Sequence, residues 1–433
     1  NFFNKKYNSQ PSTIIRYNPK KKKTWKFHAE NVHDFAFTAD PSYRIGVAEW
    51  NGVKCYSLAQ EQHASKWQNA ADYAAKIIEV FSEDFGMYTY HKIIVADARS
   101  GMEYPMICFN GGRPDKDGTY SKRTKYGMIS VIIHEVGHNY FPMIVNSDER
   151  QWTWMDEGLN SHNELRYMRT KYPEYNMLLE ELPPFITKAL DLNDYKQMMR
   201  EIMYFMNAWT GKDQPIELHS AEYTDMNYGG IVYSKTAIVF DYLMAYLGED
   251  VYDKCMQTYF DRWHYKHPQP KDLKVVFEEV SGKNLSWFFE DVIGTIKQLD
   301  YAIVGMKKET KDLLITLENK GGIAGPVIMS GVKDGQSMTP LWIEGFEGDD
   351  IVFVSDEESD LGEGPFEFIF LRKNRPPILD FIRFSNALSG LAFGEQYDII
   401  VQAGNTITFS SGEDFGEGSV SFETGFLPMA HDP

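Results

Sequence analysis

The sequence "SVIIHEVGHNYF" (Ser130–Phe141) places two histidines four residues apart inside an otherwise apolar run. The apolar spacing predicts a helix, on which residues i and i+4 lie only about 40° apart around the axis. His134 and His138 can therefore point two imidazoles at one metal ion. Glu135 lies beside them, where a carboxylate can accept a proton from a water molecule that the metal acidifies.

A second predicted helix supplies a third ligand. The stretch "QWTWMDEGLNSHNELRYM" (Gln151–Met168) carries Glu157 near its start, nineteen residues after His138. Two histidines and one glutamate with an open position suit zinc best, so we expect one catalytic zinc ion. Glu164 lies two turns beyond Glu157 on the same face, and we expect it to accept a hydrogen bond from a ligand imidazole.

The alternative for the two histidines is a structural role, because a single histidine in an apolar helix is more often a hydrogen-bonded core residue than a ligand. Here, however, two histidines and two glutamates are expected at one place. Burying that set without a metal would leave charges unpaired, at a cost of several kcal/mol. This cost favours the metal site.

Composition sets limits on the class of protein. The 433 residues are enough for two or three domains, and 43% hydrophobic and 15% aromatic residues are typical of a folded globular chain. The formal charge of -18 argues against nucleic acid as a partner. We expect a soluble protein, cytoplasmic or exported, because no apolar run reaches the roughly 18 residues of a membrane helix and no signal peptide is visible.

The pattern along the chain changes twice. Trp25–Asp40 and Gly52–Leu58 are expected to form strands, and Ser65–Gly86 has the spacing of a helix that ends at a glycine. Residues 124–293 are predicted to be mainly helical, with helices at Lys235–Leu247 and Asp272–Val280. After Asp300, six alternating stretches predict a small antiparallel β-sandwich: "DYAIVGM", "DLLITLEN", "GPVIMSGV", "TPLWIEGF", "DIVFVS" and "FEFIFL".

The metal motif also resembles that of a known family. "HEVGH" followed by "WMDEGLN" is similar to the aminopeptidase N family of gluzincin zinc metallopeptidases. "SGMEYPMI" (Ser100–Ile107) resembles the family's G-x-M-E-N strand, which implies that Glu103 holds the substrate's free α-amine and that Gly101 belongs to the same substrate-binding edge. "YSKTA" resembles the family's Y-x-K-G segment, which implies that Tyr233 donates a hydrogen bond to the oxyanion.

The resemblance covers roughly residues 34–304 and implies an α+β multidomain fold. A thermolysin-like catalytic domain with a mixed sheet and a helical half is expected over residues 45–300. Residues 1–44 are expected to be the remnant of an N-terminal β domain, and residues 301–433 a β-sandwich with no prediction for the tail after residue 375. The chain is therefore expected to be a fragment. Tyr104 and Thr236 depart from the family, which usually has Asn and Gly there.

The predicted function is zinc-dependent removal of N-terminal residues from peptides, with Glu135 as general base. Two alternatives remain: an endopeptidase that uses the same zinc on internal bonds, and a peptide-binding protein without turnover. The acidic stretches Asp115–Gly118 and Ser355–Gly364 are expected to be a turn and a solvated loop rather than calcium sites. The oligomeric state is not predicted.

Overall fold

The structure is a computed structural model of the whole chain. It describes residues 24–114, 117–173, 200, 203–204, 208, 211–309, 312–333, 336–337, 341–355, 367–370, 397–402 and 406–411. The chain divides into two compact units, one comprising Asn1–Asn146 with Trp263–His267 and the other Ser147–Arg262 with Pro268–Pro433. Residues 1–23, 115–116 and 356–366, for which the sequence suggests a domain remnant, a turn and an acidic loop, lie outside the described residues.

The first unit is built on a four-stranded mixed sheet in the order β1-β2-β3-β4. β1 (Arg44–Trp50) pairs antiparallel with β2 (Val53–Ala59). β3 (Lys92–Asp97) and β4 (Ile107–Asn110) continue the sheet in parallel register from β2. Because β3 and β4 run parallel, their carboxyl ends lie at the same end of the sheet. The segment that joins β3 to β4 starts from that end.

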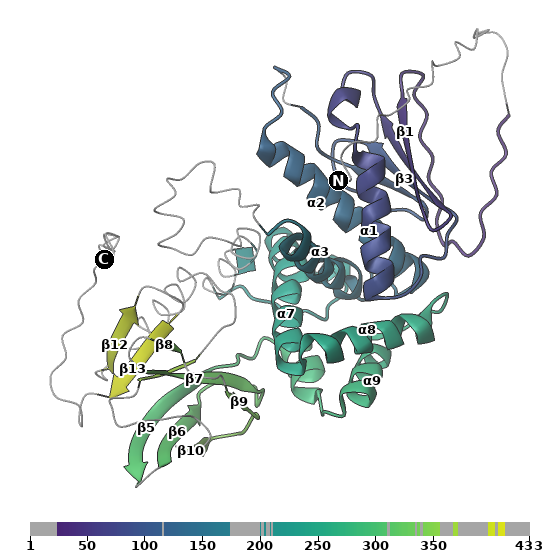
Figure 1. The fold of residues 1–433 in the computed structure, drawn as a ribbon. Coiled ribbons are helices and arrows are strands. Elements are labelled where there is room, and N and C mark those ends of the chain that lie inside the picture. The colour runs from purple at the N-terminus through teal and green to yellow at the C-terminus, as the bar shows by residue number, and fades with distance from the viewer. Residues whose placement is uncertain are drawn as a thin grey trace. The chain divides into compact units, whose positions relative to one another are not determined.

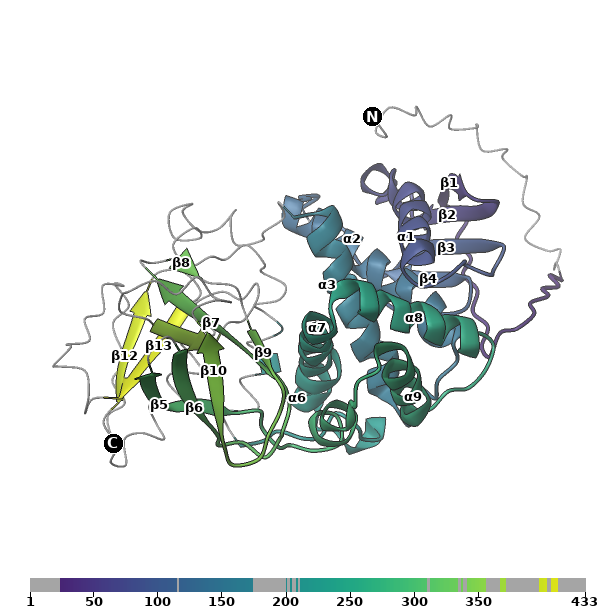
Figure 2. The same ribbon diagram turned by 60° about the horizontal axis from the view of Figure 1, so that its bottom comes forward.

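Two helices pack against this sheet and against each other (Figures 1 and 2). α1 (Ala70–Asp84) buries three of its four alanines and both of its isoleucines, and it ends before Gly86, as the sequence predicts. α2 (Lys122–Gly137) begins at Ser121, whose side chain accepts a hydrogen bond from the Thr124 backbone N–H at 3.1 Å. The buried face of α2 carries apolar residues up to its last turn: Met128, Ile129, Ile132, Ile133 and Val136.

The prediction of a strand over Trp25–Asp40 is wrong, because residues 24–43 form neither helix nor strand. Among the described residues, no strand pairs with this stretch, and a strand needs a neighbour for its backbone hydrogen bonds. Its aromatic side chains pack on one another instead, with the rings of Phe27 and Phe35 5.6 Å apart. The aromatic content of the stretch resembles that of a strand, but these rings are more than half exposed.

The second unit begins with a group of helices, as the sequence predicts. α7 (Thr236–Leu247) ends at Gly248, and α9 (Pro270–Ser281) ends at Gly282, whose φ of 68° is the left-handed conformation that a glycine C-cap favours. Arg166 on the helix α3 (Leu159–Lys171) forms an ion pair with Asp253 of the helix α8. The other helical elements are η2 (Ala64–Lys66), η6 (Ser220–Glu222), α6 (Asp225–Asn227), α8 (Glu249–Trp263) and η8 (Trp287–Val292).

Strands follow the helices, and all six predicted stretches contain one. β5, β6 and β10 form one antiparallel sheet in the order β10-β6-β5, and the remaining strands form a second sheet. Ile315, Leu317, Met329 and Ile343, which come from both sheets, form one buried apolar cluster. The strands are β5 (Tyr301–Glu309), β6 (Asp312–Asn319), β7 (Val327–Lys333), β8 (Gln336–Ser337), β9 (Leu341–Ile343), β10 (Asp349–Ser355), β11 (Glu367–Phe370), β12 (Tyr397–Gln402) and β13 (Thr406–Ser411). Across all the residues that the structure describes, we find no helix with the length and apolar character needed to cross a membrane.

Widened, π-helical turns follow or precede the helices near the predicted ligands: η3 (Asn139–Ile144), which is kinked at the non-helical Phe141, η4 (Trp154–Gly158) and η7 (Tyr228–Lys235). η4 runs directly into α3, and η7 runs directly into α7. Gly158 is the contact point of the last two turns, because a Cβ there would lie 2.4 Å from Thr236 Cγ2 and 2.6 Å from the Val232 carbonyl oxygen. Such turns are frequent at functional sites.

We expect Gly158→Ala to lower the free energy of unfolding by about 1 to 3 kcal/mol, because the new methyl group would clash with the short β-branched side chain of Thr236 and with the Val232 backbone carbonyl. Gly229→Ala on η7 is the matched control, since nothing lies within 4 Å of a Cβ there. Urea unfolding of the two variants and the unaltered protein measures both effects. Equal stability of all three proteins would show that η4 and η7 do not meet at Gly158.

Polar residues occupy the buried interior beside these turns. His162 on α3 is 1% exposed, and its ring lies 6.2 Å from that of Phe240 and 5.4 Å from that of Tyr252. Burial lowers the pKa of His162 to about 4, because the charged imidazolium would lose its hydration among these rings. His162 is therefore neutral in the folded protein at neutral pH.

Because of this lowered pKa, the free energy of unfolding falls as the pH is lowered. In the unfolded chain His162 has an ordinary pKa of about 6.5, so between about pH 6.5 and 4 the unfolded chain binds a proton that the folded protein does not. We expect the free energy of unfolding to fall by up to about 3 kcal/mol from this residue as the pH is lowered through that window.

Urea unfolding between pH 7 and pH 4.5, with a chelator present throughout, measures this dependence. His162→Gln removes the titration and keeps a polar side chain of similar length, so its stability should fall less steeply over the same range. If the free energy of unfolding falls equally with pH in the two proteins, His162 is not a source of the pH dependence.

Candidate functional site

The first two predicted ligands lie where α2 ends. His134 is in the last turn of α2, and His138 caps its C-terminus. His138 Nδ1 lies 3.2 Å from the Phe141 carbonyl oxygen, which can only accept a hydrogen bond. Nδ1 of His138 therefore carries a hydrogen, and in the neutral imidazole Nε2 has the lone pair.

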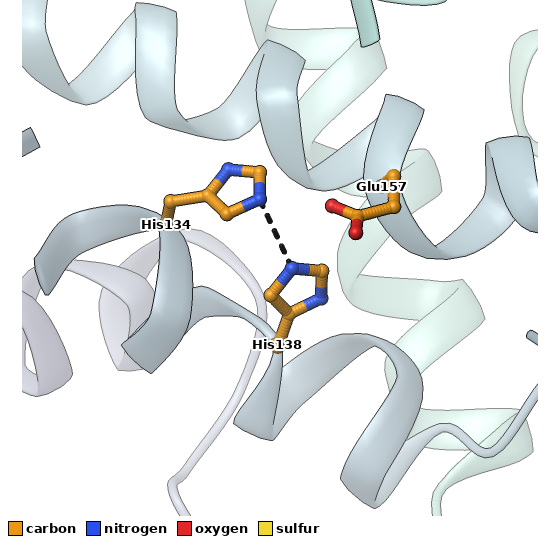
Figure 3. Close-up of side chains that lie close together, drawn as sticks. All are labelled: His134, His138 and Glu157. Carbon is orange, nitrogen blue, oxygen red and sulfur yellow. Dashed lines mark hydrogen bonds between the residues drawn. The ribbon is translucent and has the colours of Figure 1, made fainter. Parts of the chain in front are cut away.

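The two imidazoles face each other in a way that suits one ion. Their Nε2 atoms are 3.1 Å apart (Figure 3). Two nitrogens bound to one tetrahedral ion at about 2.0–2.1 Å lie roughly 3.3 Å apart. The observed separation is thus close to the one that a shared metal requires.

Glu157, on η4, completes the group. One nitrogen of His134, one of His138 and a carboxylate oxygen of Glu157 all lie within 4.8 Å of one another. Figure 3 shows the Glu157 carboxylate directed toward the two rings. The structure thus brings together the three residues that the sequence selects, and two imidazoles with one carboxylate are ligands that a divalent transition metal accepts.

Tyr233 lies beside this group, because its hydroxyl donates a hydrogen bond to Oε1 of Glu157. Burial raises the pKa of Tyr233, and the nearby negative charge of Glu157 raises it further. The phenol therefore stays protonated at any physiological pH and remains a hydrogen-bond donor.

Glu164 has a partner that the sequence does not indicate. Its Oε2 accepts a hydrogen bond from Arg200 Nη2 at 2.8 Å, and Arg200 Nη1 donates to the Tyr233 carbonyl oxygen at 3.2 Å. Glu164 is thus linked through Arg200 to the backbone of the element that carries Tyr233. Its predicted bond to a ligand imidazole stays a prediction.

The segment that carries Gly101 and Glu103 is not the regular strand that the resemblance implies. Met102 alone bridges to Phe109 of β4, with N–O distances of 3.0 and 2.8 Å. Pro105 then follows, and proline has no N–H to continue a ladder, so the chain turns before β4. The segment still lies along β4, at the edge of the sheet.

Both predicted substrate-binding residues, Gly101 and Glu103, lie next to other residues of the site. Gly101 lies against the Glu135 carboxylate. Glu103, His138 and Asp156 form a second group whose ligand atoms all lie within 4.8 Å of one another. Asp156 was not selected from the sequence, although it precedes Glu157 directly. Its position directly before a predicted ligand is the sequence feature that could have indicated Asp156.

Comparison with known proteins gives a consistent result. The Peptidase family M1 domain matches residues 69–292, which is more than half of the chain. Aminopeptidase M1-D of Oryza sativa subsp. japonica is 25% identical over 314 residues, which cover 70% of this chain and 32% of that protein.

Other relatives carry similar names. Puromycin-sensitive aminopeptidase of Caenorhabditis elegans is 24% identical over 207 residues, covering 47% of this chain and 20% of that protein. Probable aminopeptidase 2 of Sulfurisphaera tokodaii is 26% identical over 237 residues, covering 53% and 28%. The chain spans about a third or less of the length of these relatives. The match to the family domain nevertheless extends over every predicted ligand, and the chain belongs to peptidase family M1.

Proposed function

We propose that this chain carries the active site of a zinc-dependent aminopeptidase, which hydrolyses the N-terminal peptide bond of peptides. The observation that carries the proposal is the convergence of His134, His138 and Glu157 on one point. The names of the relatives, which are aminopeptidases, support the same reaction. The substrates that we propose are peptides with a free N-terminus.

The proposed domain plan follows the same reasoning. Residues 45–300 would form the thermolysin-like peptidase domain, which the mixed sheet with α1 and α2 supports. Residues 301–433 would form a β-sandwich, which the buried cluster shared by the two antiparallel sheets supports. Residues 1–44 would belong to a preceding β domain.

His134, His138 and Glu157 would hold the zinc ion. Zinc bound there would lower the pKa of a coordinated water to about 7 and polarise the carbonyl of the bond to be cleaved. The Phe141 carbonyl would keep His138 in the tautomer that presents Nε2.

Glu135 would carry out the proton transfers of the hydrolysis. Its carboxylate would accept a proton from the attacking water while the water oxygen bonds to the carbonyl carbon. The same proton would pass to the leaving nitrogen as the C–N bond breaks. The products are a free amino acid and a peptide shortened by one residue, so one water is consumed for each bond cleaved.

Tyr233 and Glu103 would act on the substrate itself. The Tyr233 hydroxyl, which now donates to Glu157, would donate to the carbonyl oxygen as negative charge develops on it. The Glu103 carboxylate would pair with the substrate's α-ammonium group, which places the first peptide bond of the substrate, and no internal bond, at the site.

An endopeptidase would use the same metal and Glu135, but it would gain nothing from Glu103. We therefore expect aminoacyl amides with a free amine to be cleaved and their N-acetyl forms not to be. Glu103→Gln should lower kcat/KM for the free-amine substrates by about 10- to 100-fold, because a charge-assisted hydrogen bond is lost.

A panel of chromogenic aminoacyl amides beside their N-acetyl forms measures this preference. Asp225→Asn, an exposed carboxylate on α6, controls for the loss of one negative charge. Equal cleavage of acetylated and free substrates would make the protein an endopeptidase.

We expect Glu135→Gln to lower kcat by at least about 100-fold while the protein keeps its zinc, because the amide cannot accept the proton but is not a ligand. Metal content measured by elemental analysis and kcat measured on the same sample separate the two effects. A chelator should abolish activity and added zinc should restore it. Activity in neither protein, with zinc bound, would favour a peptide-binding role over catalysis.

A further inference from the structure

Gly101 lies where a side chain cannot be accommodated without moving Glu135. A Cβ built at Gly101 would lie 2.0 Å from Glu135 Oε1 and 2.9 Å from its Cδ, with Val131 Cγ1 the next nearest atom at 3.4 Å. Ordinary contacts of a Cβ begin near 3.4 Å. The Glu135 carboxylate therefore occupies the volume that any other residue at position 101 would fill.

The backbone gives no other reason for a glycine at this position. The φ of Gly101 lies outside the left-handed region, so alanine could adopt it without strain. Gly101 is exposed, whereas Glu135 is only 5% exposed. The close contact is thus with one group, the carboxylate that we propose as the general base.

We infer that Gly101 is a positioning residue for Glu135, whose bare backbone lets the carboxylate lie where it takes the proton from the attacking water. This inference rests on the proposed role of Glu135. It differs from the role that the family resemblance implies for Gly101, in which the residue contacts the substrate. The two roles predict different kinetics.

The distance from a Cβ at position 101 to Glu135 Oε1 indicates how far kcat should fall in Gly101→Ala. A methyl group 2.0 Å from Oε1 requires the carboxylate to move by more than about 1 Å. A displacement of about 1 Å in a catalytic group can lower the rate by roughly 100-fold. The moving atom is the far end of a flexible side chain, so the protein should keep its fold and its metal.

The test is Gly101→Ala, made in the unaltered protein and in Glu135→Ala. In the unaltered protein we expect kcat to fall about 100-fold, KM to change less than about twofold, and zinc content and Tm to stay the same. In Glu135→Ala no carboxylate remains to be displaced, so Gly101→Ala should cause no further loss of kcat. Gly127→Ala, on the same helix as Glu135 with nothing within 4 Å of its Cβ, should leave both constants unchanged.

A crystal structure of Gly101→Ala supplies a readout that does not depend on turnover. A Glu135 carboxylate displaced by about 1 Å or more supports the inference, and an undisplaced carboxylate overturns it. A raised KM, or an equal loss of kcat in both backgrounds, would assign Gly101 to substrate contact instead. An unaltered protein that binds zinc but cleaves no substrate would overturn the proposed function. The crystal structure would still show whether a side chain at position 101 displaces the Glu135 carboxylate.

Discussion

The site depends on one hydrogen bond that fixes the state of His138. Its Nδ1–H donates to the Phe141 carbonyl, so Nε2 has a lone pair and faces Nε2 of His134. His138 is fully buried, and an imidazole so enclosed has few alternative orientations. The residue that supplies this carbonyl, Phe141, has non-helical φ and ψ and marks a kink inside η3, which begins directly after His138. The orientation of the His138 ring therefore depends on the Phe141 carbonyl as well as on the four-residue spacing of the two histidines.

Two further widened turns position the remaining groups. Glu157 lies on η4 and Tyr233 on η7, and the hydrogen bond between their side chains joins the two turns. The same turns meet at Gly158, whose missing side chain leaves room for Thr236. Thr236 is the first residue of α7 and directly follows η7. In each case a π-helical turn holds a residue of the site close to a helix terminus.

The shared direction of His134 and His138 could be predicted from the sequence, because residues four apart lie on the same face of a helix whatever surrounds it. Glu103 required the family resemblance, since a lone glutamate in an irregular segment has no periodicity. The strand expected around it was wrong because Pro105 limits the pairing with β4 to the single bridge at Met102. Arg200 and Asp156 were missed because their contacts join residues far apart in the chain, and no local pattern encodes such contacts.

Charge connects the metal to the choice of substrate. Carboxylate oxygens of Glu103 and Asp156 lie within 4.8 Å of each other, and Glu157 adds a third carboxylate at the histidine pair. Like charges this close to each other repel. A divalent ion at His134 and His138 would offset the charge of Glu157 but is not expected to neutralise all three carboxylates. The α-ammonium group of a bound peptide would supply positive charge, whereas an acetylated terminus would supply none. The charges of these residues therefore support the proposed preference for free N-termini.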